Sequence, residues 1–179
     1  MDINAVELAR LNFYRASELH GGLVLGQLVR RVRDGELMLN LTRHSAEEVK
    51  HAQLWTETII EVGGRPAPVR ETYQRRLAMR VGVPSSVFQV LALTQVFERR
   101  VYAHFIRHAR LQGTHRAVRI CLERMIDEEK DHLSWVHDWL RAEGERRHID
   151  VNALMHSYAD ADLGVYRELL SEHRFQQAA

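Results

Sequence analysis

The stretch "AEEVKHAQLW", residues 46–55, places a glutamate and a histidine three residues apart in a segment whose inward-facing neighbours are apolar. Those apolar neighbours are Leu41, Trp55 and Ile59. Residues three apart share one face of an α-helix, so Glu48 and His51 are expected to point together toward the core. A buried carboxylate needs a compensating charge, and the groups opposite this stretch therefore decide the fold.

A second stretch, "DEEKDHLSW" at residues 127–135, repeats the arrangement with Glu129 and His132. A lone glutamate precedes each E-x-x-H motif: Glu18 lies 30 residues before Glu48, and Glu98 lies 31 residues before Glu129. With turns expected near residues 34 and 113, each hairpin places its two glutamates at one height, at about 1.5 Å per helical residue. The sequence thus predicts that four carboxylates and two imidazoles converge.

Two divalent cations would neutralise four buried carboxylates, whose burial alone costs several kcal/mol each (order of magnitude). Imidazole and oxygen ligands together suit iron or manganese better than calcium or magnesium, and a zinc site more often contains cysteine or more histidine. We therefore expect two iron ions, with manganese as the alternative. The expected ligands are Glu18, Glu48, His51, Glu98, Glu129 and His132.

A third E-x-x-H motif, Glu145 to His148, lies just after Gly144 among arginines. No lone glutamate accompanies it, and we interpret it as the solvated start of a helix. Glu47 and Glu128, the other acids of the two EE pairs, are turned about 100° from the inner face. They are expected to face solvent or to contact the ligands from outside.

The spacing of apolar residues and of helix-breaking residues predicts an all-α chain. Apolar residues recur at intervals of three and four, and the three prolines lie at positions 66, 68 and 84. The first expected helix begins at Asp2 or Asn4 and ends near residue 33, and the second follows a short turn and ends near residue 62. Three further helices are expected at 70–80, at 86 to about 111 and at 115–143, and Gly144 is expected to end the last one. A further amphipathic helix, capped by Asp150, is expected in the tail.

Two tight hairpins joined by a long crossover form one of the common four-helix bundle connectivities. One glutamate followed by E-x-x-H, twice, resembles the ferritin-like di-iron carboxylate superfamily, to which the rubrerythrins and several di-iron hydroxylases belong. The resemblance covers about residues 5–143 and implies that Glu48 and Glu129 bridge the two metals. The expected domains are a bundle over residues 1–144 and a C-terminal helical extension, 145–179, that packs on it.

Composition excludes several other classes of protein. The formal net charge is +1, so neither nucleic acid nor an anionic membrane is expected as a partner. A single cysteine, Cys121, excludes an intramolecular disulfide framework and a four-thiolate metal site within the chain. No apolar stretch reaches the roughly 18 residues of a membrane span, and no signal peptide is recognisable. We expect a cytoplasmic protein.

Four residues beside the expected ligands are candidates for outer contacts or for a substrate pocket. His44 lies one turn before Glu48, where a satisfied core histidine is the simpler interpretation. Tyr14 and Tyr102 lie one turn from Glu18 and Glu98, where they could bond to carboxylates, relay electrons or only pack. Gly22 lies one turn after Glu18 and could leave space for dioxygen or an organic substrate, with close helix packing as the alternative.

The leading functional hypothesis is a non-haem di-iron oxidoreductase that activates dioxygen or peroxide. A hydroxylase of a small organic substrate is favoured because the glycines suggest room, and it resembles the demethoxyubiquinone hydroxylases and the tRNA-modifying di-iron hydroxylases. An external electron donor is expected, since the chain lacks paired cysteines for a rubredoxin segment. A homodimer is the expected assembly.

Three alternatives stay open. The first is a rubrerythrin-like peroxidase without its rubredoxin domain. The second is a ferroxidase subunit of an iron-storage shell, and the third is a metal-free bundle used for interaction. Size-exclusion chromatography separates storage from the rest, because a monomer or dimer encloses no cavity to fill.

Overall fold

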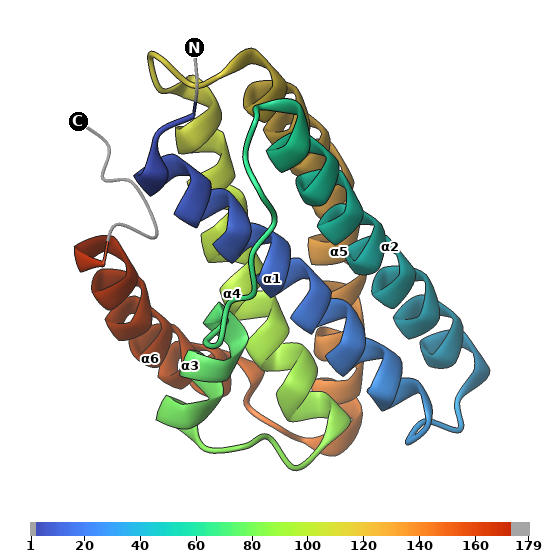
Figure 1. Ribbon diagram of the computed structural model, residues 1–179. Coiled ribbons are helices and arrows are strands. Elements are labelled where there is room, and N and C mark those ends of the chain that lie inside the picture. The colour runs from blue at the N-terminus through green and yellow to red at the C-terminus, as the bar shows by residue number, and fades with distance from the viewer. Residues whose placement is uncertain (1–2, 173–179) are drawn as a thin grey trace.

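The computed structural model describes residues 3–172, and within that range it contains six α-helices and no strand (Figure 1). The all-α prediction is therefore confirmed. The helices are α1 (Ala5–Val29), α2 (Gly35–Glu61), α3 (Tyr73–Val81), α4 (Val87–Arg110), α5 (Arg116–Arg147) and α6 (Val151–Ser171).

Two antiparallel hairpins form the bundle. α1 packs along α2, α4 packs along α5, and α2 contacts α5 to join the two hairpins (Figure 1). Polar side chains cap the first two helices. Asn4 Oδ1, one of the two expected caps, accepts from the Glu7 amide at 2.8 Å, and Asp34 Oδ1 accepts from the Leu37 amide at 2.8 Å. Such caps each stabilise a helix by about 1 kcal/mol.

The crossover between the hairpins runs back along α1 from the end of α2 to α3 (Figure 1). The side-chain amide of Asn12 in α1 bonds to the crossover through both its oxygen and its nitrogen. The Ala67 amide donates to Asn12 Oδ1 at 2.6 Å, and Asn12 Nδ2 donates to the Arg65 carbonyl at 3.3 Å. Arg15 adds a bond to the Ala67 carbonyl at 2.8 Å. The crossover is thus fixed to the bundle by side chains of α1.

The sequence-based end of α5 is wrong. We expected Gly144 to stop the helix, but α5 continues to Arg147 and ends at His148, whose φ of 55° is left-handed. Gly144 is instead buried against α6, and a Cβ there would overlap Val151 Cγ2. Glu145 and His148 consequently lie at the exposed end of α5 and do not start a helix.

α6 packs on α4 and on the short α3. Asp162 of α6 is 1% exposed, and it accepts hydrogen bonds from Tyr73 Oη at 2.5 Å and from Arg100 Nε at 2.7 Å. These contacts attach the C-terminal helix to the bundle. The division into domains at residue 144 stays a prediction, and residues 173–179 of the expected extension lie outside the described range. None of the helices described here has the length and apolar character needed to cross a membrane.

Candidate metal centre

The six expected ligands meet in the middle of the bundle, and all of them are buried. Glu18 comes from α1, Glu48 and His51 from α2, Glu98 from α4, and Glu129 and His132 from α5. Their exposed fractions lie between 0% for His51 and 6% for Glu18. The apolar residues beside them, such as Leu41 and Trp55, are fully buried, so the inner face of each helix is one continuous stripe.

One group of donors gathers around His51. Its Nδ1 lies 3.6 Å from Glu18 Oε2, 3.9 Å from Glu48 Oε1 and 3.5 Å from Glu129 Oε1. One ligand atom from each of these four residues lies within 4.8 Å of the others. The group can therefore hold one metal ion.

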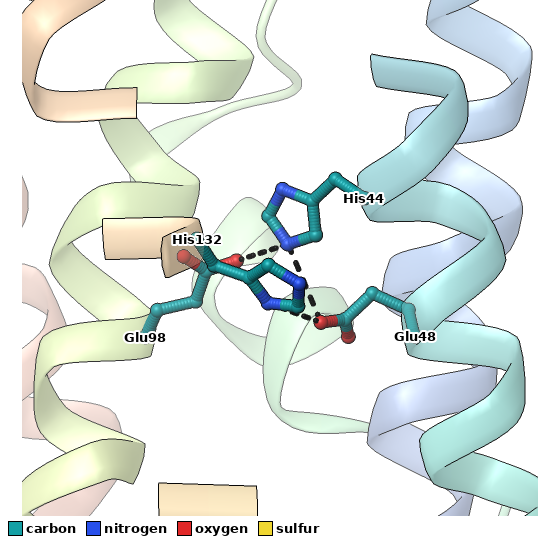
Figure 2. A group of neighbouring side chains, drawn as sticks. All are labelled: His44, Glu48, Glu98 and His132. Carbon is teal, nitrogen blue, oxygen red and sulfur yellow. Dashed lines mark ion pairs between the residues drawn. The ribbon is translucent and has the colours of Figure 1, made fainter. Parts of the chain in front are cut away.

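A second group gathers around His132 and includes His44 (Figure 2). His132 Nδ1 lies 3.3 Å from Glu48 Oε1, and His44 Nε2 lies 3.1 Å from Glu98 Oε1. One atom each from His44, Glu48, Glu98 and His132 again lies within 4.8 Å of the rest. The centre therefore offers two adjacent places for an ion.

Glu48 and Glu129 lie between the two places. Glu48 belongs to both groups. Glu129 directs one carboxylate oxygen to each histidine, with Oε1 3.5 Å from His51 Nδ1 and Oε2 3.4 Å from His132 Nδ1. Glu18 and Glu98 each reach only one group. The arrangement is compatible with the predicted bridging roles of Glu48 and Glu129, which stay predictions.

Two outer carboxylates orient the histidines across the bundle. His51 Nε2 of α2 donates to Glu128 Oε2 of α5 at 2.8 Å, and His132 Nε2 of α5 donates to Glu47 Oε2 of α2 at 2.9 Å. A proton on Nε2 leaves the lone pair of the neutral ring on Nδ1, which faces the cluster. Both expectations for Glu47 and Glu128 hold in part, because these side chains are 39% and 31% exposed and each also contacts an expected ligand from outside.

Several donor atoms that face the centre make no aligned hydrogen bond among the described residues. They are His51 Nδ1, His132 Nδ1, His44 Nε2, Glu48 Oε1, Glu98 Oε2 and Glu129 Oε2. Buried polar atoms normally have hydrogen-bond partners, and a cluster of exceptions needs an explanation. Divalent cations fit, because every atom in the cluster has a lone pair and together the four carboxylates match two double charges.

In the protein without metal ions, the pKa values of several buried carboxylates are shifted. Burial raises the pKa of Glu18 well above its ordinary value, and the nearby Glu48 carboxylate raises it further. Burial also raises the pKa of Glu98, although His44 opposes the rise. For Glu48, burial acts in the same upward direction, but the close approach of His132 and His44 outweighs it and the pKa is lowered.

The histidines respond in the opposite sense. Burial lowers the pKa of His51, but the carboxylates of Glu18, Glu48 and Glu129 together outweigh burial and raise that pKa to about 9. Burial likewise disfavours the charged form of His132, while Glu129 and Glu48 raise its pKa to about 12. Protons on the imidazoles thus balance the carboxylates in the protein alone, and metal ions would take over that role.

Tyr14 is buried, and its hydroxyl is bonded to His104 Nε2 at 2.7 Å and His108 Nδ1 at 3.1 Å, both on α4. Tyr102 is half-buried. A bond from either tyrosine to a carboxylate ligand stays a prediction. The signal that sequence reasoning missed was the pair His104 and His108, spaced one turn apart on the face opposite Tyr14.

Gly22 does not border open space, so its interpretation as a substrate channel is wrong. A Cβ at Gly22 would lie 2.8 Å from Val49 Cγ2 and 3.0 Å from the Ser45 carbonyl oxygen. Ser45 Oγ also donates to the Gly22 carbonyl at 2.7 Å. The glycine permits close packing of α1 on α2, which was the alternative interpretation.

Two cavities of about 850 and 530 Å³ occur elsewhere in the described part of the chain. The larger lies between α4, α5 and α6 and is lined by Arg99, Arg107 and Arg141 among others. The smaller lies beside α3 and is lined by His20, Gln74 and Phe97 among others. None of the six expected ligands lines either cavity.

Comparison with known proteins supports the interpretation of the centre. Bacterioferritin from Desulfovibrio desulfuricans (strain ATCC 27774 / DSM 6949 / MB) is 28% identical to this chain over 140 residues, which cover 75% of this chain and 74% of the bacterioferritin. The resemblance to the ferritin-like di-iron proteins is confirmed. No family model matches this ferritin-like chain, and no solved structure matches it.

Proposed function

We propose that this ferritin-like protein is a di-iron oxidoreductase that oxidises Fe(II) with dioxygen or peroxide. One observation carries the proposal: two groups of buried donors overlap at Glu48 and share Glu129, so that two ions would lie side by side. Six residues from four helices supply them, and the bacterioferritin similarity points to iron as the metal.

The reaction needs two electrons for each oxidant molecule. Two Fe(II) ions lose one electron each, and dioxygen gains both electrons and two protons to give hydrogen peroxide; with peroxide as oxidant the product is water. A bound iron pair supplies both electrons and Lewis acidity at one place. The protein's own contribution is to hold carboxylates that balance the higher charge of the oxidised ions, and to orient both imidazoles through Glu47 and Glu128.

Oxidation of iron itself is favoured over hydroxylation of an organic substrate. The hydroxylase hypothesis depended on space beside Gly22, and that position is filled by Val49 and Ser45. Neither described cavity is lined by the expected ligands. The similarity to a bacterioferritin also favours chemistry on iron over chemistry on an organic substrate.

Anaerobic addition of Fe(II) to the metal-free protein, followed by oxygen, tests the proposal. We expect two Fe(II) bound per chain, rapid appearance of Fe(III) absorbance on oxygen exposure, and repeated turnover with further Fe(II). Glu145→Ala, which removes the glutamate of the exposed third motif, should bind and oxidise Fe(II) as the unmodified protein does. Metal binding without turnover in the unmodified protein would overturn the iron-oxidase function.

The oligomeric state distinguishes an oxidase that forms a small assembly from a storage subunit that forms a closed shell. A homodimer is the assembly that we propose, and an external electron donor is then needed only if Fe(III) must be reduced for a new cycle. Size-exclusion chromatography with light scattering measures the assembly. A closed shell that retains many iron atoms per chain would favour storage.

A further inference from the structure

His44 occupies a place for which the duplicated pattern gives no counterpart. It is 1% exposed and lies one turn before Glu48 on the inner face of α2 (Figure 2). The same offset from Glu129 on α5 leads to Met125, a fully buried apolar residue. One of the two places for an ion therefore has a second imidazole beside it, and the other has a thioether residue at the equivalent position of its helix.

The surroundings of His44 are those of a ligand and not of a satisfied core histidine. Its Nε2 lies 3.1 Å from Glu98 Oε1 and 3.3 Å from Glu48 Oε1, yet neither ring nitrogen makes an aligned hydrogen bond among the described residues. His51 and His132, by contrast, each donate from Nε2 to an outer glutamate. A buried Nε2 that faces two carboxylates without an aligned hydrogen bond is costly unless something else binds it.

The distances match one coordination shell. Ligand atoms about 2.1 Å from a common ion, at angles of 90° to 109°, lie roughly 3.0–3.4 Å from one another. The observed separations are 3.1 Å from His44 to Glu98, 3.3 Å from His44 to Glu48 and 3.3 Å from His132 to Glu48. The ring of His44 also stacks on that of His132, with centroids 3.7 Å apart, so both rings approach the same side of the centre.

We infer that His44 is a seventh protein ligand, which makes the two ions unequal: the ion beside Glu98 takes two imidazoles, and the ion beside Glu18 takes one. The inference rests on the proposed two-metal centre. Imidazole is a suitable ligand for iron and neighbouring first-row transition ions, and His44 gives the place beside Glu98 a donor that the other place lacks. The place beside Glu98 is therefore filled first.

Paramagnetic NMR of the full chain loaded with two Co(II) ions counts the imidazole ligands directly. Each coordinated ring keeps one N–H, on Nδ1 for His44 and on Nε2 for His51 and His132, and gives one strongly shifted exchangeable signal. We expect three such signals from the unmodified protein and two from His44→Ala. His104→Ala is the control, because His104 is equally buried but bonds to Tyr14 outside the cluster; it should keep three.

Co(II) titration followed by absorption gives the second readout. The unmodified protein should bind two ions in separate steps, and His44→Ala should weaken one step by at least about tenfold while the other changes little. Two shifted signals from the unmodified protein with two bound Co(II) ions would overturn the role of His44 and leave the proposed function standing. Failure to bind two ions at all would overturn both.

Discussion

Glu128 of α5 accepts a hydrogen bond from His51 of α2, with the carboxylate oxygen and Nε2 2.8 Å apart. Glu47 of α2 does the same for His132 of α5 at 2.9 Å. The residue before each expected bridging glutamate thus holds the histidine of the opposite hairpin. Each half of the centre is oriented by the other half.

Loss of one outer carboxylate should loosen one histidine without removing a ligand. We expect Glu128→Ala to weaken metal binding by about 10- to 100-fold while two ions still bind at saturation. Isothermal titration with Co(II) measures the change. Glu123→Ala removes an exposed acid of the same helix and should have no effect. Equal affinities for both variants would show that Glu128 does not orient His51.

Loss of a ligand should have a larger effect. Glu48→Ala or His132→Ala is expected to abolish stoichiometric loading, because each removes a donor that faces the centre. His148→Ala, at the exposed end of α5, should leave two ions per chain. Elemental analysis of protein purified without chelator gives the ratio. An equal loss in all three variants would count against the assignment of ligands.

Metal removal should lower thermal stability, because an ion that binds the folded chain and not the unfolded one stabilises the fold by mass action. A metal present at about 100 times its dissociation constant stabilises by about 2.7 kcal/mol, which corresponds to a rise in Tm of about 5–10 °C for a chain of this size. Calorimetry with metal and with chelator measures the difference. Glu18→Gln should raise the Tm of the metal-free protein and shrink the shift, since burial disfavours the charged form of Glu18.

Gly22 should be intolerant of even one added methyl group. Gly22→Ala gains about 1 kcal/mol of helix propensity, but the Cβ would press on the Ser45 carbonyl and on Val49. We expect a net loss of about 1–3 kcal/mol, typical of overpacking. Urea unfolding measures it. Gly35→Ala is the matched control at the start of α2, where a Cβ would meet nothing within 4 Å, and an equal loss there would refute the packing explanation.

Cys121 should resist alkylation in the folded protein. It is 6% exposed, and burial raises the pKa of its thiol to about 12, although a hydrogen bond with Thr58 opposes the rise. Because the pKa is raised, the reactive thiolate is scarce below that pH, on the order of 1 part in 10⁴ at pH 8. Mass spectrometry after iodoacetamide should show no adduct at pH 8 and one adduct in guanidinium. Prompt native labelling would contradict this.

The sequence was sufficient for whatever depends on position along one helix. Helical periodicity placed Glu18, Glu48 and their counterparts on inner faces, and equal distances from the two turns brought them to one height, as the structure has them. Their role as ligands is still a prediction. Features that depend on the distance between two helices could not be predicted from the sequence. Gly22 faces a carbonyl of α2, and Gly144 faces Val151 of α6; neither approach distance is encoded in a spacing.

His44 illustrates the same limit. Its position one turn before Glu48 indicated the inner face, but its contact with Glu98 depends on how α2 and α4 approach across the bundle. The sequence therefore offered an outer contact, a proton carrier, a substrate contact or a core histidine, and the tertiary arrangement suggested the further role of a ligand.

The crossover bound to Asn12 makes the centre a property of a single chain. Each hairpin carries only part of the donor set, so two separate hairpins would have to associate before the complete set could bind an ion. Because the crossover joins the two halves covalently, each half has a fixed effective concentration for the other, whatever the dilution of the protein. Metal uptake should consequently follow first-order dependence on chain concentration, down to the scarcest amounts a cell would contain.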